Sequence, residues 1–213
     1  MATKEDFIQS LGIVRKQEDD RKEKINFNQT VDLIINLREF DVTKTPINIF
    51  VNLPHKIRDK KVAGFLEKKS DLLDTITKPE FDNFKDKKKS KELVRSYDFF
   101  IAGAKLMPLI ATTFGRVLGP AGKMPSPQLG VLMTEDDNSI KNLLQKVQNV
   151  IKIRAKEPSI KIAIGKQSDK DENIAENAAL AFSEVFKLLP RNKENLRNVL
   201  IKFTMGKPVK VKI

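Results

Sequence analysis

The pattern of predicted strands changes twice along this 213-residue chain. Toward both ends, apolar and polar residues alternate, as in Val31–Leu37, Ile160–Ile164 and Val209–Ile213. A period of two predicts strands with one buried face and one solvent-facing face. In the middle, Phe99–Ala102 is apolar throughout, as expected of a strand covered on both faces. We therefore expect two different kinds of sheet in one chain.

Two amphipathic helices are predicted in the outer portions. Thr3 followed by Asp6 has the spacing of a capping box, in which a hydroxyl oxygen accepts a backbone N–H at the start of a helix. Ser168 and Asp171 have the same spacing before the second helix. The apolar face of that helix is formed by Ile174, Ala178, Ala181, Phe182, Val185 and Leu189. Strands with one solvent-facing face and two such helices indicate an α+β domain.

Strand and helix alternate in the middle portion. A short apolar strand over Val62–Leu66 precedes a charged helix predicted over Asp82–Tyr97. A second strand precedes a helix predicted over Leu106–Leu118, and a third helix begins at a cap formed by Asn138 or Ser139. This alternation is typical of parallel βαβ units.

The change of pattern predicts two domains. Residues 1–56 and 149–213 form a discontinuous α+β domain, with an antiparallel sheet and two helices in a split βαβ-like arrangement. Residues 57–148 form an inserted α/β domain with a Rossmann-like, three-layer fold. The connector Pro54–Lys61 is polar and basic, as expected at a domain boundary. We interpret its His55 as a solvent-facing side chain, neither ligand nor catalyst.

Composition narrows the possible functions. The absence of cysteine excludes disulfides and thiolate metal sites, and a single histidine excludes a multi-histidine site. No apolar run has membrane-spanning length and no signal peptide is recognisable, so we expect an intracellular protein. We expect no metal and no cofactor. The chain holds 40 Lys and Arg against 28 Asp and Glu, a net charge of +12, which favours a polyanionic partner such as nucleic acid.

One glycine-rich run stands close to a lysine. Residues 114–127 read FGRVLGPAGKMPSP. A phosphate-binding loop requires glycine, four residues, then Gly-Lys-Ser or Gly-Lys-Thr. Val117 stands where the first glycine is required, and Met124 follows Lys123, so the spacing does not fit. We instead expect a helix that ends at the second glycine and a loop stiffened by proline, leaving Arg116 and Lys123 free to contact phosphate.

The C-terminal stretch contains an interrupted strand. Thr204-Met205-Gly206-Lys207-Pro208 separates two strand-like runs, Leu200–Phe203 and Val209–Ile213. Gly206 permits a backbone conformation that other residues resist, and Pro208 lacks the N–H that a ladder needs. Two interpretations remain open: a hairpin turn that ends an edge strand, or a flat contact surface for a polyanion.

Together these motifs resemble the family of large-subunit ribosomal protein L-one over nearly the whole chain. The strongest mark is the run 115–120 with Met-Pro-Ser-Pro at 124–127. Thr204-Met205-Gly206 is the second mark, and the strand start at residues 27–32, FNQTVD, is the third. The Thr-Met-Gly-Lys-Pro sequence is similar to archaeal and eukaryotic members rather than bacterial ones.

The resemblance implies a two-domain, non-enzymatic protein of the mobile ribosomal stalk. Such proteins bind a stem-loop region of large-subunit rRNA, chiefly through the discontinuous domain. They assist the release of deacylated tRNA from the exit site. In bacteria and archaea they also repress translation of their own mRNA. The implied location is the cytoplasmic ribosome.

The resemblance also implies which residues contact rRNA: Phe27, Thr30, Asp32, Arg154, Lys166, Ser168, Thr204, Met205 and Gly206. Arg116, Lys123, Lys202 and Lys207 are secondary candidates for phosphate contact. From the residues alone, a single phenylalanine such as Phe27 is by default a core residue. Asp32 would repel phosphate, so we expect it to orient a donor or to accept a hydrogen bond from a 2′-hydroxyl. No catalytic or metal-binding residue is expected.

Two other classes of function remain open at this stage. The first is a nucleotide-using enzyme built on the middle α/β domain, against which the unsuitable glycine spacing and the single histidine count. The second is a basic scaffold for acidic proteins, which binding assays with RNA and heparin would distinguish.

Overall fold

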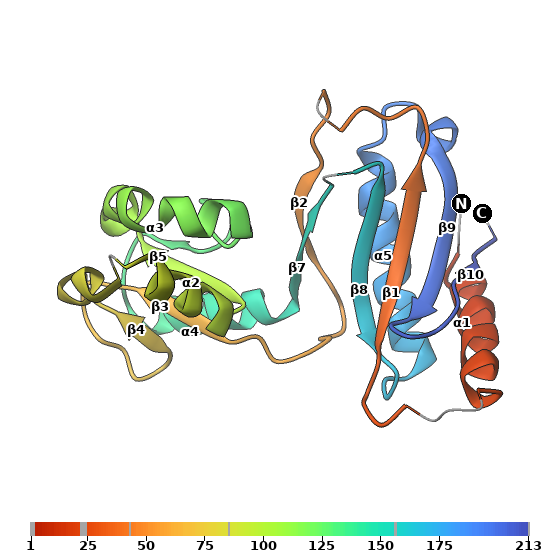
Figure 1. Ribbon diagram of the computed structural model, residues 1–213, viewed down its shortest axis with the longest axis horizontal. Helices are drawn as coiled ribbons and strands as arrows, with labels where there is room; N and C mark the ends of the chain where they lie inside the picture. The colour runs from red at the N-terminus through yellow and green to blue at the C-terminus, as the bar shows by residue number, and fades with distance from the viewer. Residues whose placement is uncertain (1–2, 22–24, 43, 85, 156, 213) are drawn as a thin grey trace. The chain divides into compact units, whose positions relative to one another are not determined.

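The computed structural model describes residues 3–21, 25–42, 44–84, 86–155 and 157–212. The chain divides into two compact units (Figure 1). The outer unit comprises Met1–Arg58 and Asn149–Ile213, and the inserted unit comprises Asp59–Gln148. Antiparallel sheets occur in the outer unit and a parallel sheet in the inserted unit, which confirms the predicted mixture of sheet types.

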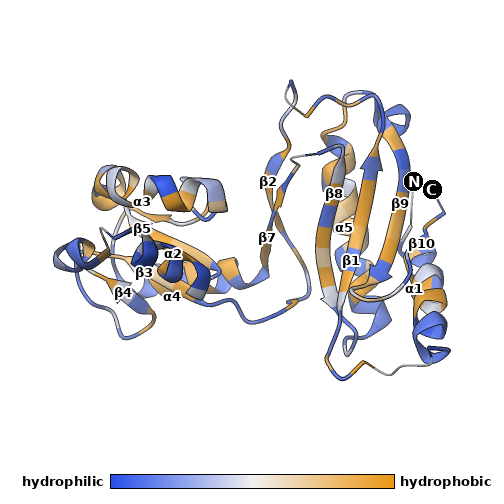
Figure 2. Ribbon diagram, in the orientation of Figure 1, coloured by the Kyte–Doolittle hydropathy of each residue, from blue (hydrophilic) through white to orange (hydrophobic). Residues whose placement is uncertain are grey.

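The outer unit is built on a four-stranded antiparallel sheet with the order β10-β9-β1-β8. Its strands are β1 (Thr30–Leu37), β8 (Ser159–Lys166), β9 (Leu196–Phe203) and β10 (Val209–Lys210). In β1 the side chains of Val31, Leu33, Ile35 and Leu37 are buried, and the alternate ones are half-buried on the other face. The predicted alternation is thus confirmed, and Figure 2 shows polar bands between the hydrophobic stretches of β1. Ile213 lies outside the described residues.

Helices α1 (Lys4–Asp19) and α5 (Asp171–Lys187) provide the other half of this core. Phe7 of α1 meets Phe182 of α5 edge to face, with ring centroids 6.3 Å apart. Each such fully buried side chain contributes about 1.5–3 kcal/mol through the hydrophobic effect. The capping box of α1 is confirmed, because the Thr3 hydroxyl accepts from the Asp6 N–H while the Asp6 carboxylate accepts from the Thr3 N–H.

The second predicted capping box is wrong. Lys170 occupies the N-cap position of α5, with no side-chain cap. Ser168 is instead bound to Asn28, and the Asp171 carboxylate pairs with Arg15 at 2.7 Å. These partners lie 140 and 156 residues away in sequence, so tertiary contacts override the local capping pattern.

A smaller antiparallel pair joins the two halves of the outer unit. Strand β2 (Asn48–Asn52) pairs with β7 (Val150–Arg154), and Asn52 lies opposite Val150. Beyond β2, the buried side chain of Asn177 bonds both the N–H and the carbonyl of His55. The His55 ring lies 2.7 Å from a Glu176 carboxylate oxygen, and its side chain remains 35% exposed, so this partly solvated histidine also has a partner that the sequence did not indicate.

The inserted unit contains a four-stranded parallel sheet of order β4-β3-β5-β6. Its strands are β3 (Val62–Phe65), β4 (Asp74–Ile76), β5 (Phe99–Gly103) and β6 (Val131–Leu132). Two separate apolar clusters flank it, one with α2 (Lys87–Ser96) and α3 (Met107–Ala121), the other with α4 (Asp137–Asn149). Phe100 belongs to the first cluster and Ile101 to the second, so β5 is covered on both faces as predicted.

Three predicted helix boundaries in the inserted unit are wrong. The stretch predicted as one helix over 82–97 is a 3-10 segment, Lys78–Phe84, followed by α2, because the Asp86 carboxylate caps α2 by accepting the Lys88 N–H. Helix α3 continues through Pro120 and ends where Gly122 adopts a left-handed φ of 71°. Helix α4 begins at Asp137, ahead of both predicted caps. Two short 3-10 segments, Ala104–Leu106 and Asn192–Asn195, complete the described elements.

Candidate nucleic-acid interface

Three segments that are distant in sequence meet at one end of the outer sheet. In an antiparallel sheet β1 begins where its neighbours β8 and β9 end, and here Thr30 lies opposite Lys166 while Val31 lies opposite Phe203. The residues before β1, the turn after β8 and the turn after β9 therefore converge at the same end of the sheet (Figure 1). We call this the strand-end surface; it comprises Phe27, Thr30, Lys166, Ser168, Thr204, Met205 and Gly206.

Side-chain hydrogen bonds hold these segments to one another. Asn28 Nδ2 donates to the Ser168 hydroxyl at 2.9 Å, and Asn28 Oδ1 accepts from the Ser168 N–H at 3.2 Å. The hydroxyl of Ser168 thus acts as an acceptor within the protein, and its own hydrogen can be donated to a ligand. Thr204 is bonded to the backbone of Thr30 through both its N–H and its hydroxyl.

Two large apolar side chains project from this surface. Phe27 is 53% exposed and Met205 is 56% exposed. The default interpretation of Phe27 as a core residue is wrong, because it precedes the first paired residue of β1 and the core beneath the sheet does not reach it. An exposed aromatic ring offers a face on which a base can stack.

The backbone of Gly206 is less unusual than the sequence suggests. Its N–H bonds the carbonyl of Phe203 at 2.9 Å, closing a tight turn. Among the described glycines only Gly122 and Gly130 have a positive φ, so the expectation of a special backbone conformation at Gly206 is wrong. A Cβ at this position would lie 3.4 Å from the Cβ of Phe203, which is an ordinary van der Waals approach.

Charged residues lie beside this surface on the open face of the sheet. Asp32 and Lys202 are directly opposite each other on β1 and β9, and both are half-buried. Burial raises the pKa of Asp32, and the positive charge of Lys202 offsets part of that rise. Lys207 is exposed in the turn after β9. Lys166, Lys202 and Lys207 can therefore supply positive charge around the strand-end surface.

The remaining predicted residues are not part of this cluster. Arg154 ends β7, close in sequence to the start of β8, whereas Lys166 ends that strand. At ~3.3 Å per residue the eight residues of β8 span roughly 25 Å, so the start of that strand lies at the opposite end from the strand-end surface. Arg116 is exposed on α3 of the inserted unit. The prediction that Lys123 is free to bind phosphate is wrong, because its amine donates to the carbonyls of Val94 and Tyr97, both at 2.8 Å.

One residue that the sequence did not single out lies buried beneath this surface. Gln29 has no exposed surface, although it sits in a polar stretch before β1. Its side chain bonds Glu18 on α1 and the backbone N–H of Met205, and its carbonyl bonds the N–H of Gln167. A glutamine between Asn28 and Thr30 carries no sequence signal for burial, so only the contacts identify it.

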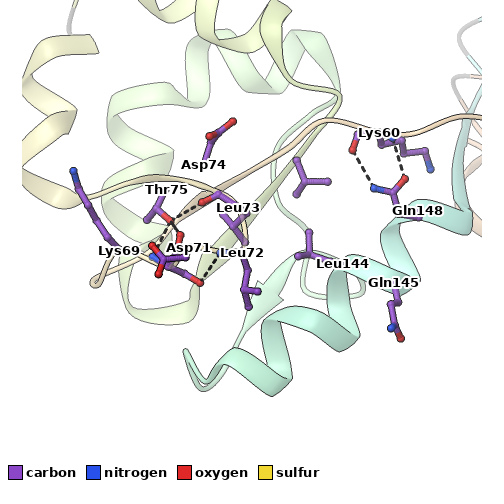
Figure 3. A pocket seen from close by; sticks show the side chains of 12 residues that line it. Lys60, Lys69, Asp71, Leu72, Leu73, Asp74, Thr75, Leu144, Gln145 and Gln148 are labelled. Carbon is purple, nitrogen blue, oxygen red and sulfur yellow. Dashed lines mark hydrogen bonds between the residues drawn. The ribbon is translucent and has the colours of Figure 1, made fainter.

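The inserted unit contains a hollow of about 770 Å³ beside β4 and α4 (Figure 3). Val62, Leu72, Leu73 and Leu144 form its apolar part. At its edge the side chain of Gln148 bonds both the N–H and the carbonyl of Lys60. The glycine-rich run lies elsewhere, mostly within helix α3, so it does not form a phosphate-binding loop.

The described residues contain neither a candidate metal-binding cluster nor a membrane-spanning helix. No group of three or more His, Cys, Asp or Glu side chains in the described part of the chain could hold a metal ion. Among the same residues, no helix has the length and apolar character needed to cross a membrane.

Comparison with known proteins identifies the family. Residues 15–207 match the ribosomal protein L1p/L10e family. The chain belongs to this family. The predicted family resemblance is therefore confirmed, and L1p/L10e proteins are ribosomal proteins rather than enzymes.

Several relatives of the L1p/L10e family match along most of the chain, and each bears the name large ribosomal subunit protein uL1. The Pyrobaculum calidifontis protein is 31% identical, covering 96% of this chain and 95% of its own length. The Thermofilum pendens protein is 35% identical, with 88% and 86% covered. The Thermococcus kodakarensis protein is 34% identical, with 92% and 94% covered.

Proposed function

We propose that this protein is a constituent of the large ribosomal subunit and binds a stem-loop region of large-subunit rRNA through the strand-end surface. The observation that carries the proposal is the convergence of residues 27–30, 166–168 and 204–206 at one end of the outer sheet. The names of the relatives and the net charge of +12 support the same partner.

The side chains of this surface suit RNA. Proteins recognise RNA through its shape, its 2′-hydroxyl groups and its unpaired bases. Ser168 can donate a hydrogen bond to a ribose or a phosphate, while Phe27 and Met205 can pack against base or sugar. Lysines 166, 202 and 207 can contact phosphates, which positions the RNA without reading its sequence.

The finer assignments rest on the family. In this proposal residues 1–56 and 149–213 are the rRNA-binding domain, with a split βαβ-like fold, and residues 57–148 are an inserted domain of Rossmann-like, three-layer type. The complex with rRNA forms the mobile stalk of the cytoplasmic ribosome and assists the release of tRNA from the exit site. A similar stem-loop in its own mRNA would compete for the same surface and allow repression of translation.

A binding assay with two RNAs tests the proposal. Affinity is measured for a large-subunit stalk rRNA fragment and for an unrelated stem-loop of equal length, at several salt concentrations. We expect the stalk fragment to bind more tightly at every salt concentration. The logarithm of affinity should fall linearly with log salt, with a slope of about −0.7 to −0.9 per phosphate neutralised. Equal affinity for the two RNAs would reject specific recognition.

Two control ligands address the other classes of function. Tighter binding to heparin than to either RNA would support a general basic scaffold. Nucleotide binding by the full chain would support an enzyme built on the inserted unit. No contact in the described residues favours either alternative over RNA binding.

A further inference from the structure

The Gln29 side chain is fixed in one orientation by its partners. Its Oε1 accepts the N–H of Met205 at 3.0 Å, and its Nε2 donates to Glu18 Oε1 at 2.7 Å. A backbone N–H can only donate and a carboxylate can only accept, so the reverse orientation of the amide would lose both bonds. The side chain amide of Gln167 is a third partner, at 3.4 Å from Nε2.

The same network holds the Met205 peptide from its other side. Arg21 donates to the carbonyl of Met205 at 3.1 Å, and its guanidinium lies 3.5 Å from Glu18. The carboxylate of Glu18 therefore binds Gln29 with one oxygen and Arg21 with the other. Met205 is thus held at both N–H and carbonyl by residues that share one carboxylate, which leaves its thioether pointing outward.

Gln29 also reaches the third segment of the strand-end surface. Its backbone carbonyl accepts the N–H of Gln167 at 2.8 Å, one residue before Ser168. The neighbouring Asn28 binds Ser168 itself, and the neighbouring Thr30 binds Thr204. Gln29 consequently forms hydrogen bonds to both the turn after β8 and the turn after β9.

From this geometry we propose that Gln29 is a positioning residue for RNA recognition: its buried side-chain amide holds the Met205 turn, and its backbone carbonyl holds the Ser168 turn, at the separation that the RNA requires. The inference rests on the proposed RNA-binding function. Gln29 itself does not contact RNA, because it is fully buried. The rigid support of contacting side chains is a general requirement of precise binding sites.

Gln29→Glu is the decisive substitution. The new carboxylate can still accept the Met205 N–H, but it places a second negative charge against Glu18 with no hydrogen between them. Glu18→Gln in the same molecule restores a donor to that contact and returns the net charge to its original value. We expect Q29E to weaken binding of the stalk rRNA fragment by about tenfold to one-hundredfold, and E18Q/Q29E to recover most of that loss.

Asn195→Asp is the matched control. Asn195 is also a buried amide of the outer unit, and it bonds the carbonyls of Arg38 and Glu39 and the N–H of Arg191, away from the strand-end surface. N195D therefore introduces the same charge into a comparable buried network. Its affinity for the stalk fragment, expressed per folded molecule, should change by less than about threefold.

The experiment compares these variants for stalk and unrelated RNA, together with amide hydrogen exchange at Met205 in the protein without RNA. Q29E should accelerate exchange at Met205 and lose discrimination between the two RNAs, and the double variant should reverse both effects. If Q29E does not fold, Gln29→Met, which keeps the length of the side chain without its hydrogen bonds, should show the same loss of discrimination.

Two results overturn the inference: Q29E binding RNA like N195D, or a folded double variant that fails to regain affinity. If the unaltered protein does not distinguish the two RNAs, the proposed function fails separately. The exchange data then decide the positioning role alone, and unchanged exchange at Met205 in Q29E rejects it.

Discussion

The hydroxyl of Thr204 uses its single hydrogen on the carbonyl of Thr30, at 3.2 Å, and accepts the N–H of the same residue at 3.2 Å. The threonine that the family resemblance assigns to RNA therefore also extends the β1–β9 ladder past the last paired residues. Toward RNA it can act only as an acceptor, through its remaining lone pair.

Thr204→Val should accordingly affect both stability and binding. Loss of the hydroxyl removes the partner of the Thr30 N–H, so the free energy of unfolding should fall by about 1 kcal/mol. Affinity for stalk rRNA should fall about fivefold or more. Thr204→Ser keeps both hydrogen bonds and should resemble the unaltered protein in denaturant unfolding and in RNA titration. A valine variant with unchanged stability would contradict this dual role.

Met205→Ala should separate binding from stability. The side chain is 56% exposed, so its removal should change the free energy of unfolding by less than about 0.5 kcal/mol. Its loss from the RNA contact should still weaken stalk rRNA binding severalfold. Met133→Ala is the control, because Met133 is 87% exposed on the inserted unit, outside the strand-end surface. Equal RNA affinity of the two variants would remove Met205 from the interface.

Loss of the charge at Lys123 should lower the stability of the protein, whereas loss of the charge at Lys202 should lower its affinity for RNA. Lys123→Met leaves the carbonyls of Val94 and Tyr97 without their donor, so it should lower the free energy of unfolding by about 1–3 kcal/mol. RNA affinity per folded molecule should hardly change. Lys202→Gln should instead reduce affinity for specific and unrelated RNA alike, and make the salt slope shallower by about one phosphate contact. Parallel unfolding and RNA titrations at several salt concentrations measure both effects.

Asp32→Asn should stabilise the protein in the absence of RNA at neutral pH. Burial raises the pKa of Asp32 in the folded state, so ionisation at neutral pH opposes folding. For this carboxyl, stability is greatest below the unfolded-state pKa and is lost as the pH rises through the higher folded-state pKa. The advantage of D32N should therefore be present at pH 7 and shrink as the pH falls toward 3. Urea unfolding of both proteins across this range measures it, and an advantage that grows in acid would contradict the assigned cause.

Removal of the inserted unit should leave a folded RNA-binding fragment. Asn52 and Val150 are paired across β2 and β7, and the Gln148 side chain bonds both the N–H and the carbonyl of Lys60, so a short linker can join the cut ends. The deletion should span residues 59–148 rather than 57–148, because Ile57 packs against the outer core. Circular dichroism should show a cooperative transition, and specific rRNA binding should persist. A folded fragment without RNA binding would refute the assignment of the interface to the outer unit.

Local patterns in the sequence were sufficient to predict those elements whose structure is decided by residues close together along the chain. The period of two in β1 and the helical faces of α1 and α5 follow from which side chains avoid water, and the capping box at Thr3 follows from hydrogen bonds between residues three apart. Helix ends were less predictable. The start of α2 depends on a single hydrogen bond from the Lys88 N–H to Asp86, and the end of α3 depends on the left-handed backbone of Gly122. The family was recognisable from its motifs, since these are contiguous in sequence.

The sequence by itself determined the alternation of strands and helices, the mixture of sheet types, and the membership of a ribosomal protein family. Only the tertiary structure decided that Phe27 is exposed, that Lys123 is committed to two carbonyls, and that Gln29 links the turns after β8 and β9. The physical reason is the separation along the chain between the residues that interact. Burial patterns are local, whereas the bond from Gln29 to Met205 spans 176 residues and exists only once the antiparallel register brings the strand ends together.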